Sequence, residues 1–367
     1  MLHLVSSLEV GGKERVVLEL AGEARRRGHE HALLLFDAPY RTGGRDLDPG
    51  SIPWRFTPRG PGLDLGFVHE VSRRAKGFDV VHAHNDTAIF YAAAAAALVP
   101  PWTRRPRVLG TFHTLPGHDT PWARRLTRWA TQRCCNVTAV SDELARRLVS
   151  LRWSRPCSVV WNGAPSVQET DPATRSRWRE LLGVGPNELL VGQVARFDPV
   201  KRQEDLIAAV RLARAKGMAV EAVFAGDGPT IQALRASAAA CPWLHFLGNT
   251  HDVPGLLASL DVFVLCSDHE AAPRALLEAL AAGCPSIVTA VGGMPHLVGA
   301  GTDEPAALLV PPRAPAVLAA ALQQFASPRA REIYAVRARK RALTFSGPAT
   351  FEAYEALWRD ASSPSLE

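Results

Sequence analysis

The amino-acid sequence predicts an α/β protein with two doubly wound, mainly parallel sheets. Short apolar runs alternate along the chain with stretches of helical periodicity, and many of these runs are continuously apolar, as in strands buried on both faces. The alternation restarts after a turn-rich segment at residues 161–165. The length of 367 residues exceeds one ordinary domain and suits two.

The elements follow from this alternation in chain order. The first half is expected to hold strands at residues 2–6, 31–36, 79–84, 108–113 and 137–141. The second half is expected to hold strands at 189–195, 220–225, 245–248, 262–266 and 286–290. Amphipathic helices are expected at 13–27, 202–216 and 229–240, and a last one at 351–358 has no strand after it. We therefore expect domains at 1–164 and 165–347.

The composition excludes several classes of protein. Hydrophobic residues make up 47% and charged residues 21% of the chain, which excludes a disordered or fibrous protein. The longest apolar run, residues 88–99, is shorter than the roughly 20 residues that span a bilayer. No charged and apolar leader precedes the first strand, and the six cysteines form no C-x-x-C motif. We expect a cytoplasmic protein with free thiols.

The net charge of +6 is distributed unevenly. The excess of Lys and Arg over Asp and Glu lies entirely in residues 1–165, and residues 166–367 are slightly acidic. This asymmetry favours an anionic partner for the first domain. Charge alone leaves open a nucleic acid, a phosphorylated acceptor and an anionic membrane surface.

One helix in the basic half has the pattern of an interfacial helix. Trp122, Leu126 and Trp129 fall on one face of residues 122–129, and three arginines fall on another. Such a helix can lie on a membrane surface. The alternative is an ordinary helix packed on its own sheet.

The first domain places glycines and histidines where expected strands end. Gly11 and Gly12 precede a helix whose N-terminus suits an anion, although the dinucleotide-binding pattern G-x-G-x-x-G is absent. His82 and His84 close one strand and His113 closes the next. The H-x-H pair of His82 and His84, with His113 and His118, could indicate a metal, but no carboxylate or cysteine spacing completes a site, so we expect no metal.

The second domain carries cations and carboxylates at its strand ends. Arg196 follows one strand and Lys201 opens the next helix, which suits a diphosphate. Glu270 precedes a helix that starts near Pro273, and Glu278 lies within that helix. Carboxylates can accept hydrogen bonds from sugar hydroxyls. The Gly-Asp-Gly-Pro segment at 226–229 reads mainly as a strand-to-helix turn.

Taken in order, these motifs resemble those of the retaining glycosyltransferases of family 4. They are the Gly-Gly loop, the histidines at strand ends, Arg196 with Lys201, the Gly-Asp-Gly-Pro turn and the pair Glu270 and Glu278. The resemblance implies the GT-B fold, with two Rossmann-like domains facing across a cleft. It also implies that the terminal helix, at about 348–367, crosses back onto the acceptor-binding first domain.

For the nucleotide-sugar-binding second domain, the resemblance implies a donor site. Arg196 and Lys201 would bind the diphosphate, and Glu270 would contact the sugar hydroxyls. Backbone groups near Arg274 and Ala275 would lie close to the phosphates, and Glu278 would hold the ribose. The implied donor-binding residues are Gly12, Arg196, Lys201, Asp252, Glu270, Arg274, Ala275 and Glu278.

For the first domain, the resemblance implies the acceptor side. His113 matches the active-site histidine of related lipid-acceptor mannosyltransferases, and Gly12 would approach the donor diphosphate. The implied acceptor-side residues are Gly11, Arg15, His84 and His113. The implied catalytic residues are His113, Glu270, Arg196 and Lys201.

Two positions depart from the pattern of the family. Ala271 and Ala272 stand where members usually have Gly-Phe or Gly-Met, which bears on the preference for a donor sugar. His296 stands in place of the usual glutamate after Gly-Gly-x-Pro, so any role of that carboxylate is lost or changed.

The resemblance implies a metal-independent transferase that needs no cofactor beyond its nucleoside diphosphate sugar, with UDP and GDP as the favoured nucleotides. We expect transfer with retention to an anionic or lipid-linked acceptor, with peripheral contact at the inner face of the membrane as one option. A sugar-nucleotide epimerase or hydrolase is the enzymatic alternative. A non-catalytic module for nucleic acid is another, but no recognition pattern accompanies the charge, so no nucleic acid is expected.

Overall fold

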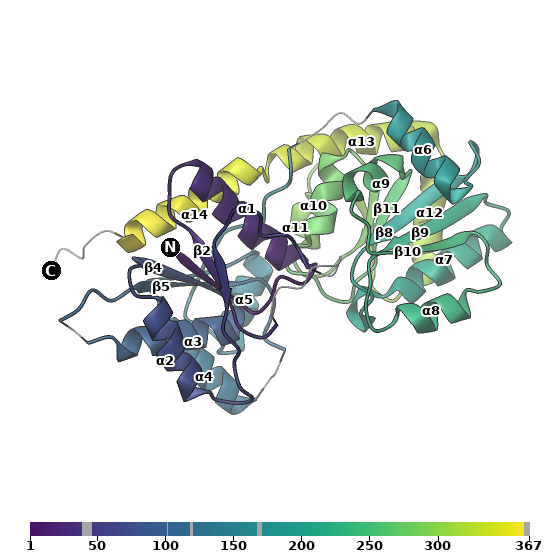
Figure 1. The fold of residues 1–367 in the computed structure, drawn as a ribbon. Helices are drawn as coiled ribbons and strands as arrows, with labels where there is room; N and C mark the ends of the chain where they lie inside the picture. The colour runs from purple at the N-terminus through teal and green to yellow at the C-terminus, as the bar shows by residue number, and fades with distance from the viewer. Residues whose placement is uncertain (39–45, 101, 118–119, 167–170, 363–367) are drawn as a thin grey trace. The chain divides into compact units, whose positions relative to one another are not determined.

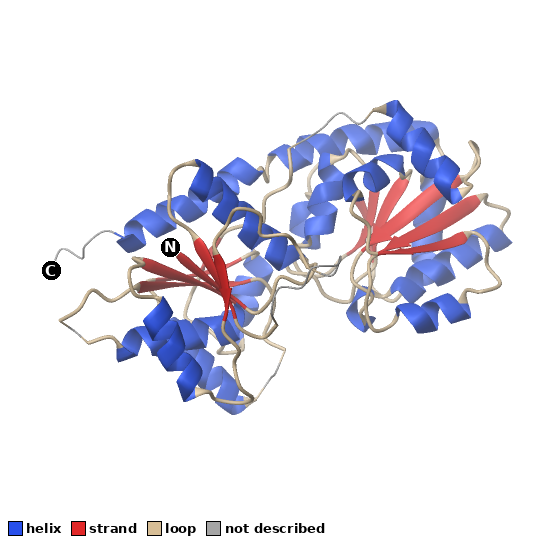
Figure 2. Cartoon of the chain, in the orientation of Figure 1, coloured by secondary structure: helices blue, strands red, loops and turns tan. Residues whose placement is uncertain are grey.

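The computed structural model describes residues 1–38, 46–100, 102–117, 120–166 and 171–362. The chain divides into two compact units (Figure 1). Unit 1 comprises Met1–Asn162 and the C-terminal segment that starts at Pro348, and unit 2 comprises Gly163–Gly347. Each unit is a parallel sheet with helices on both faces (Figure 2). The expected α/β fold class is confirmed.

The sheet of unit 1 has seven parallel strands in the order β3-β2-β1-β4-β5-β6-β7. The strands are β1 (Leu2–Val5), β2 (Ala32–Leu35), β3 (Trp54–Phe56), β4 (Val80–His84), β5 (Arg107–Phe112), β6 (Asn136–Ala139) and β7 (Ser158–Val159). The two outer strands, β3 and β7, are not predicted by the sequence, because they have only three and two residues and stay partly exposed. Their apolar pattern is therefore too short to detect.

Two layers of helices cover this sheet. The helices of unit 1 are α1 (Gly12–Arg26), α2 (Leu65–Arg74), α3 (Asn85–Leu98), α4 (Pro121–Thr131), α5 (Asp142–Ser150) and α14 (Gly347–Ser362). Val16 and Leu20 of α1 and Tyr354 and Trp358 of α14 share one core cluster with Val80 of β4. Helices α2, α3 and α4 lie together on the opposite face (Figure 1).

The sheet of unit 2 has six parallel strands in the order β10-β9-β8-β11-β12-β13. They are β8 (Leu189–Val194), β9 (Val220–Ala225), β10 (Leu244–Gly248), β11 (Val262–Leu265), β12 (Ser286–Thr289) and β13 (Ala307–Val310). Five were expected and β13 was not. Its helices are α6 (Pro172–Leu182), the 3₁₀ turn η1 (Pro199–Lys201), α7 (Gln203–Ala215), α8 (Ile231–Ser237), α9 (Val253–Ser259), α10 (Arg274–Ala281), α11 (Met294–Leu297), α12 (Pro315–Gln324) and α13 (Pro328–Leu343).

Helix α6 forms in a stretch that the sequence shows only as polar. Its anchor is Asp261, a buried carboxylate at the start of β11. Asp261 accepts hydrogen bonds from Arg175 and Arg179 of α6, at 2.6 and 3.0 Å, and from the Leu190 backbone N–H at 2.8 Å. Charge-assisted bonds of this kind attach a mainly polar helix to the sheet without a long apolar face.

Both sheets reverse their direction of winding at a single point. The reversal lies between β1 and β4 in unit 1 and between β8 and β11 in unit 2. In open α/β sheets, ligands bind outside the carboxyl ends of the strands at such a point. The residues that follow β1, β4, β8 and β11 are therefore the ones to examine for a site.

Candidate functional site

The unit 2 site is built on the loop that follows β8. The side-chain amide of Gln193 donates to the Lys201 carbonyl oxygen at 2.8 Å, and that of Gln203 donates to the Arg196 carbonyl oxygen at 2.9 Å. The backbone N–H of Asp268 donates to the carbonyl of Val200 at 2.8 Å. These bonds hold the loop after β8 against the loop after β11, so the side chains of both loops occupy fixed positions.

At the centre of this site, Lys201 and Glu270 form a close ion pair. The Lys201 Nζ lies 2.5 Å from Glu270 Oε1, and the hydroxyl of Ser267 donates to the same oxygen at 2.7 Å. Glu270 is 7% exposed, whereas the Lys201 side chain is 23% exposed. A buried carboxylate needs such partners, and a carboxylate has the capacity to accept further hydrogen bonds, such as those from a ligand hydroxyl.

The backbone beneath Glu270 is held by a glycine. Gly292 has φ of +56°, and a Cβ at this position would collide with the carbonyl oxygen of Glu270. The next residue, Gly293, donates its N–H to that same carbonyl at 3.0 Å. The Gly-Gly pair after β12 therefore allows a close approach that fixes the position of Glu270.

Helix α10 presents its N-terminus beside this loop. No side chain caps it, and Pro273 occupies the N-cap position. Arg274, which is buried, donates from Nε to Glu278 Oε1 at 3.1 Å across one turn of the helix. An uncapped N-terminus with its positive dipole end suits a phosphate, and Ala275 lies in its first turn.

The remaining residues expected at the donor site lie in different settings. Arg196 is exposed, and within the described part of the chain its guanidinium makes no ion pair. Asp252 caps α9, where it accepts from the Gly255 N–H at 2.9 Å and from the Trp178 indole N–H at 3.0 Å. No contact between Asp252 and the Lys201–Glu270 pair occurs among the described residues.

The Gly-Asp-Gly-Pro segment acts as a turn. Gly226 has φ of +135°, and a Cβ there would collide with the carbonyl oxygen of Ala195. The N–H of Phe197 donates to the Asp227 carbonyl at 3.0 Å. The turn after β9 thus packs directly on the backbone that leads to Arg196, which accounts for its glycines without a ligand.

The unit 1 site gathers residues that follow β1, β4 and β5. His113 comes directly after β5, and its backbone N–H donates to Asn85 Oδ1 at 2.8 Å. Asn85 follows β4 with φ of +70°, a conformation that asparagine tolerates better than most residues. The His113 Nδ1 atom is buried and has no hydrogen-bond partner in the described ranges. It is a candidate ligand-binding atom.

The Gly-Gly loop lies at the start of α1 in the same unit. Gly11 is the N-cap and Gly12 the first residue of α1, and no side chain caps this helix either. The Lys13 Nζ donates to Ser6 Oγ at 2.8 Å and forms an ion pair with Glu14 Oε1 at 3.0 Å. Arg15 is half-buried in the first turn. The first turn of α1 thus carries the basic side chains Lys13 and Arg15 together with the buried carboxylate of Glu14, which lies against Gly11.

Five histidines of unit 1 form one buried cluster near α14. Burial lowers the pKa of His3, His82 and His84 well below the ordinary value near 6.5. Burial also lowers the pKa of His31 to about 3 and that of His113 to about 3. All five rings are therefore neutral at pH 7.

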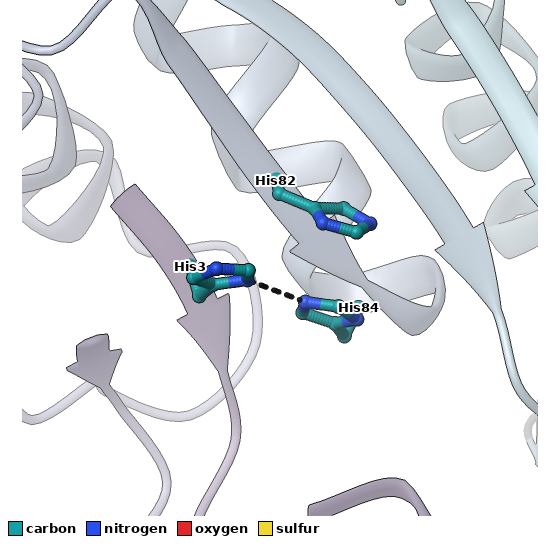
Figure 3. A group of neighbouring side chains, drawn as sticks. All are labelled: His3, His82 and His84. Atoms are coloured by element: carbon teal, nitrogen blue, oxygen red, sulfur yellow. Dashed lines mark hydrogen bonds between the residues drawn. The ribbon is translucent and has the colours of Figure 1, made fainter. Parts of the chain in front are cut away.

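Three of these rings approach one another closely enough to raise the question of a metal ion. Figure 3 shows His3, His82 and His84, whose nearest ring nitrogens lie within 4.8 Å of one another. Each ring nitrogen of the three is already in a hydrogen bond, including His82 Nδ1, which accepts from the Trp358 indole N–H at 3.3 Å. We therefore assign no metal to this cluster. His118, the other histidine considered from the sequence, lies outside the described residues.

Sequence reasoning missed several residues of both sites. Ser267 lies in a loop and Asn85 is the first residue of α3, and neither shows a pattern of its own. His3 bonds His84, and His31 bonds His3; the only signal for either in the sequence was a histidine within or beside an apolar strand. Lys13 was visible directly after Gly-Gly, but its contact with Ser6 depends on the fold.

Comparison with known proteins identifies the family. A family model described as Glycosyltransferase Family 4 matches residues 10–166, and one described as Glycosyl transferases group 1 matches residues 188–327. The 2-deoxystreptamine N-acetyl-D-glucosaminyltransferase of Streptomyces fradiae is 30% identical over 345 residues, covering 82% of this chain and 79% of that protein. The GDP-mannose-dependent alpha-mannosyltransferase of Mycobacterium tuberculosis is 28% identical, with coverage of 83% and 81%.

A solved structure shows the same fold. HepE from Anabaena, in complex with UDP-glucose, superposes with a TM-score of 0.81 at 23% identity, covering 98% of this chain and 99% of that one. The doubly wound domains described above are therefore those of the GT-B fold, as expected. The chain belongs to glycosyltransferase family 4.

Proposed function

We propose that this protein transfers a sugar from a nucleoside diphosphate sugar to an acceptor hydroxyl with retention at the anomeric carbon. Unit 2 binds the donor and unit 1 binds the acceptor. The observation that carries the proposal is the buried Lys201–Glu270 pair beside the uncapped N-terminus of α10. The relatives act on or were solved with nucleotide sugars, GDP-mannose in one case and UDP-glucose in another, which supports UDP or GDP as the nucleotide.

The proposed chemistry assigns each group a task. When the bond between the sugar and the diphosphate breaks, negative charge grows on the leaving phosphate. Lys201, Arg196 and the N–H groups at the start of α10 stabilise that charge, so the site works without a metal. Glu270 holds the sugar hydroxyls and Glu278 holds the ribose. The acceptor attacks from the face that the diphosphate leaves, and the departing phosphate takes the acceptor proton.

Thermal denaturation with a panel of nucleotide sugars tests the donor. A donor present at 100 times its Kd adds about 2.7 kcal/mol to the free energy of unfolding. This raises Tm by about 5–10 °C for a unit of this size. We expect such a shift with at least one UDP- or GDP-sugar, and a much smaller one in Lys201→Ala. Lys216→Ala, on an exposed lysine of the same unit, is the matched control.

A shift with NAD(P) and none with any nucleotide sugar would overturn the donor assignment. The epimerase or hydrolase alternative gains no support from the relatives described above. It predicts that the donor is consumed without an acceptor, whereas transfer predicts that release of nucleoside diphosphate depends on one. The anomeric configuration of the product, read by NMR, tests retention.

For the acceptor, we propose an anionic or lipid-linked molecule reached at a membrane surface. Among the described residues, no helix is long and apolar enough to cross a membrane. Helix α4 supports contact from one side. Its buried residues are Thr127, Ala130 and Thr131, whereas Trp122 is 63% exposed. Trp129 and Leu126 of the same face are half-buried, and the Trp129 ring centroid lies 6.0 Å from that of Phe90 in α3. The N-terminal end of α4, with its exposed Trp122, is thus the part of this helix that can lie on a membrane surface.

Further exposed apolar residues lie at the same edge of the sheet. Leu63 and Leu65, 52% and 71% exposed, stand at the start of α2, and both α2 and α4 pack against α3. Arg125 and Arg128 of α4 are also exposed. Apolar side chains among arginines are what an anionic bilayer surface attracts.

Flotation with liposomes tests the membrane contact. The protein is expected to float with vesicles containing anionic lipid at low salt and to lose much of that binding at high salt. The double variant Arg125→Glu with Arg128→Glu is expected to abolish flotation, and Arg329→Glu, on an exposed arginine of unit 2, to leave it unchanged. Flotation that does not depend on the anionic lipid content would contradict the proposed contact and leave solubility as the role of the excess basic residues.

A further inference from the structure

Four buried histidines of unit 1 form a continuous hydrogen-bonded chain. His31 Nδ1 lies 2.9 Å from His3 Nε2, and His3 Nδ1 lies 3.2 Å from His84 Nε2. His84 Nδ1 lies 3.1 Å from His113 Nε2. The rings come from the segment before β2, from β1, from β4 and from the end of β5, so the chain crosses three neighbouring strands.

The identity of the nitrogens constrains the protons. A neutral imidazole has one N–H donor and one acceptor nitrogen. Each of the three junctions joins the Nδ1 of one ring to the Nε2 of the next. If His113 donates from Nε2, then His84 and His3 must also donate from Nε2, and His31 must accept at Nδ1. The four rings therefore share one tautomer, either all Nε2–H or all Nδ1–H.

The two ends of the chain differ. At one end, His113 Nδ1 is buried and has no partner among the described residues. In the Nε2–H state it can only accept a hydrogen bond, and in the Nδ1–H state it can only donate one. At the other end, His31 packs near His29, with ring centroids 6.4 Å apart, and His29 is bonded to Glu355 at the surface. To convert His113 from acceptor to donor, one proton must enter at His113 Nδ1, each shared proton must move one junction towards His31, and one proton must leave His31 at Nε2.

The surroundings favour collective movement of the protons. Charging any single ring would place a cation in a buried site, and for His84 and His113 that site also lies near Lys13. Trp358 covers two of the rings: its indole centroid lies 5.0 Å from the ring centroid of His31 and 6.1 Å from that of His3. A shift that leaves all four rings neutral avoids this desolvation penalty.

We propose that His31, His3 and His84 are positioning residues that form a proton relay and set whether His113 presents a hydrogen-bond donor or an acceptor to bound substrate. The relay takes up one proton at His31 and delivers one at His113 Nδ1, or the reverse, and no ring gains a net charge. The inference rests on the proposed function only in assigning the substrate of His113. The coupling among the four rings is a property of the folded unit itself.

Nitrogen-15 NMR of histidine-labelled protein reports each tautomer directly. We expect His31, His3, His84 and His113 to give the same tautomer. When UDP-glucose or GDP-mannose is added, all four rings should again share one tautomer, whether or not it is the original one. His82 is an internal control: it accepts from Trp358 at Nδ1 and must be the Nε2–H form in every sample. Different tautomers within the four, or a change at His113 alone, would overturn the relay.

A pair of variants separates the relay from a structural role. His3→Phe breaks the chain at its centre with little change of volume, and His82→Phe makes the same change in an adjacent buried ring outside the chain. We expect His3→Phe to lower kcat for transfer at least about tenfold and His82→Phe to change it less than about twofold, at similar thermal stability. Equal loss in both, or none in either, would contradict the relay. If the wild type transfers no sugar, the proposed function fails while the NMR comparison still decides the coupling.

Discussion

Replacement of Glu270 by glutamine is expected to lower kcat/KM for sugar transfer by about a thousandfold, with the fold intact. The carboxylate accepts from both Lys201 and Ser267, and it is the buried anion that fixes the position of the lysine. Glutamine keeps the shape but removes the charge. Lys201 then loses its partner, and the sugar hydroxyls lose a charged acceptor. Initial-rate kinetics with a donor identified by thermal shift measures the effect.

The matched control is Glu332→Gln, on an exposed glutamate of α13 in the same unit, which is expected to behave as wild type. Circular dichroism and Tm separate loss of chemistry from loss of fold. Turnover near the wild-type value in folded Glu270→Gln would remove this residue from the site, and with it the proposed donor site.

Unit 1 is expected to unfold as the pH falls from about 6.5 towards 5. Burial lowers the pKa of five of its histidines, so the native unit stays neutral there while the unfolded chain binds protons near pH 6.5. The contribution of these histidines to the free energy of unfolding is therefore complete above about pH 6.5 and is lost as the pH falls below that value. For each pH unit below about 6.5, each such histidine lowers the free energy of unfolding by about 1.4 kcal/mol, and the five together lower it by about 7 kcal/mol. That slope approaches the whole stability of a typical domain.

Scanning calorimetry between pH 5 and 8 measures this loss, and proteolysis at each pH identifies the unit that opens. The four histidines of unit 2 are exposed or half-buried, so its transition should move far less. His82→Phe should reduce the slope of unit 1 by about one fifth, and His251→Gln, at an exposed position of unit 2, should not change it. Parallel movement of both transitions would show that the buried histidines are not the cause.

The two sheets illustrate what a sequence can predict. Most of the ten predicted strands are continuous apolar runs, as in strands buried on both faces, although the edge strand β10 is only partly buried. Strands β3, β7 and β13 lack a comparable signal: β3 and β7 have partly exposed residues, and β13 lies between turns. Helix α6 was not predicted because two charge-assisted contacts, from Arg175 and Arg179 to Asp261, rather than a long apolar stripe, hold it to the sheet.

The site shows a similar division. Arg196 and Glu270 could be named because they follow strands, and a parallel sheet brings strand ends to one edge. Lys201 and Glu278 were named from the helical segments that come next. Their partners could not: whether Lys201 meets Glu270, or His84 meets His3, depends on side-chain directions that only packing determines. Asp252 is the opposite case. It was expected at the donor site, but it caps α9 and bonds Trp178, and its position in the sequence did not show these contacts.

The packing of α14 has a consequence for the order of events during synthesis. Tyr354 and Trp358 complete a core whose other members lie near the beginning of the chain, and Trp358 supplies the bond that fixes His82. Residues 163–347 emerge from the ribosome as one continuous segment and can complete their own sheet first. Unit 1 must wait, with its histidine-lined face uncovered, until the last helix arrives. The first half of the chain to be translated is thus the last to finish folding.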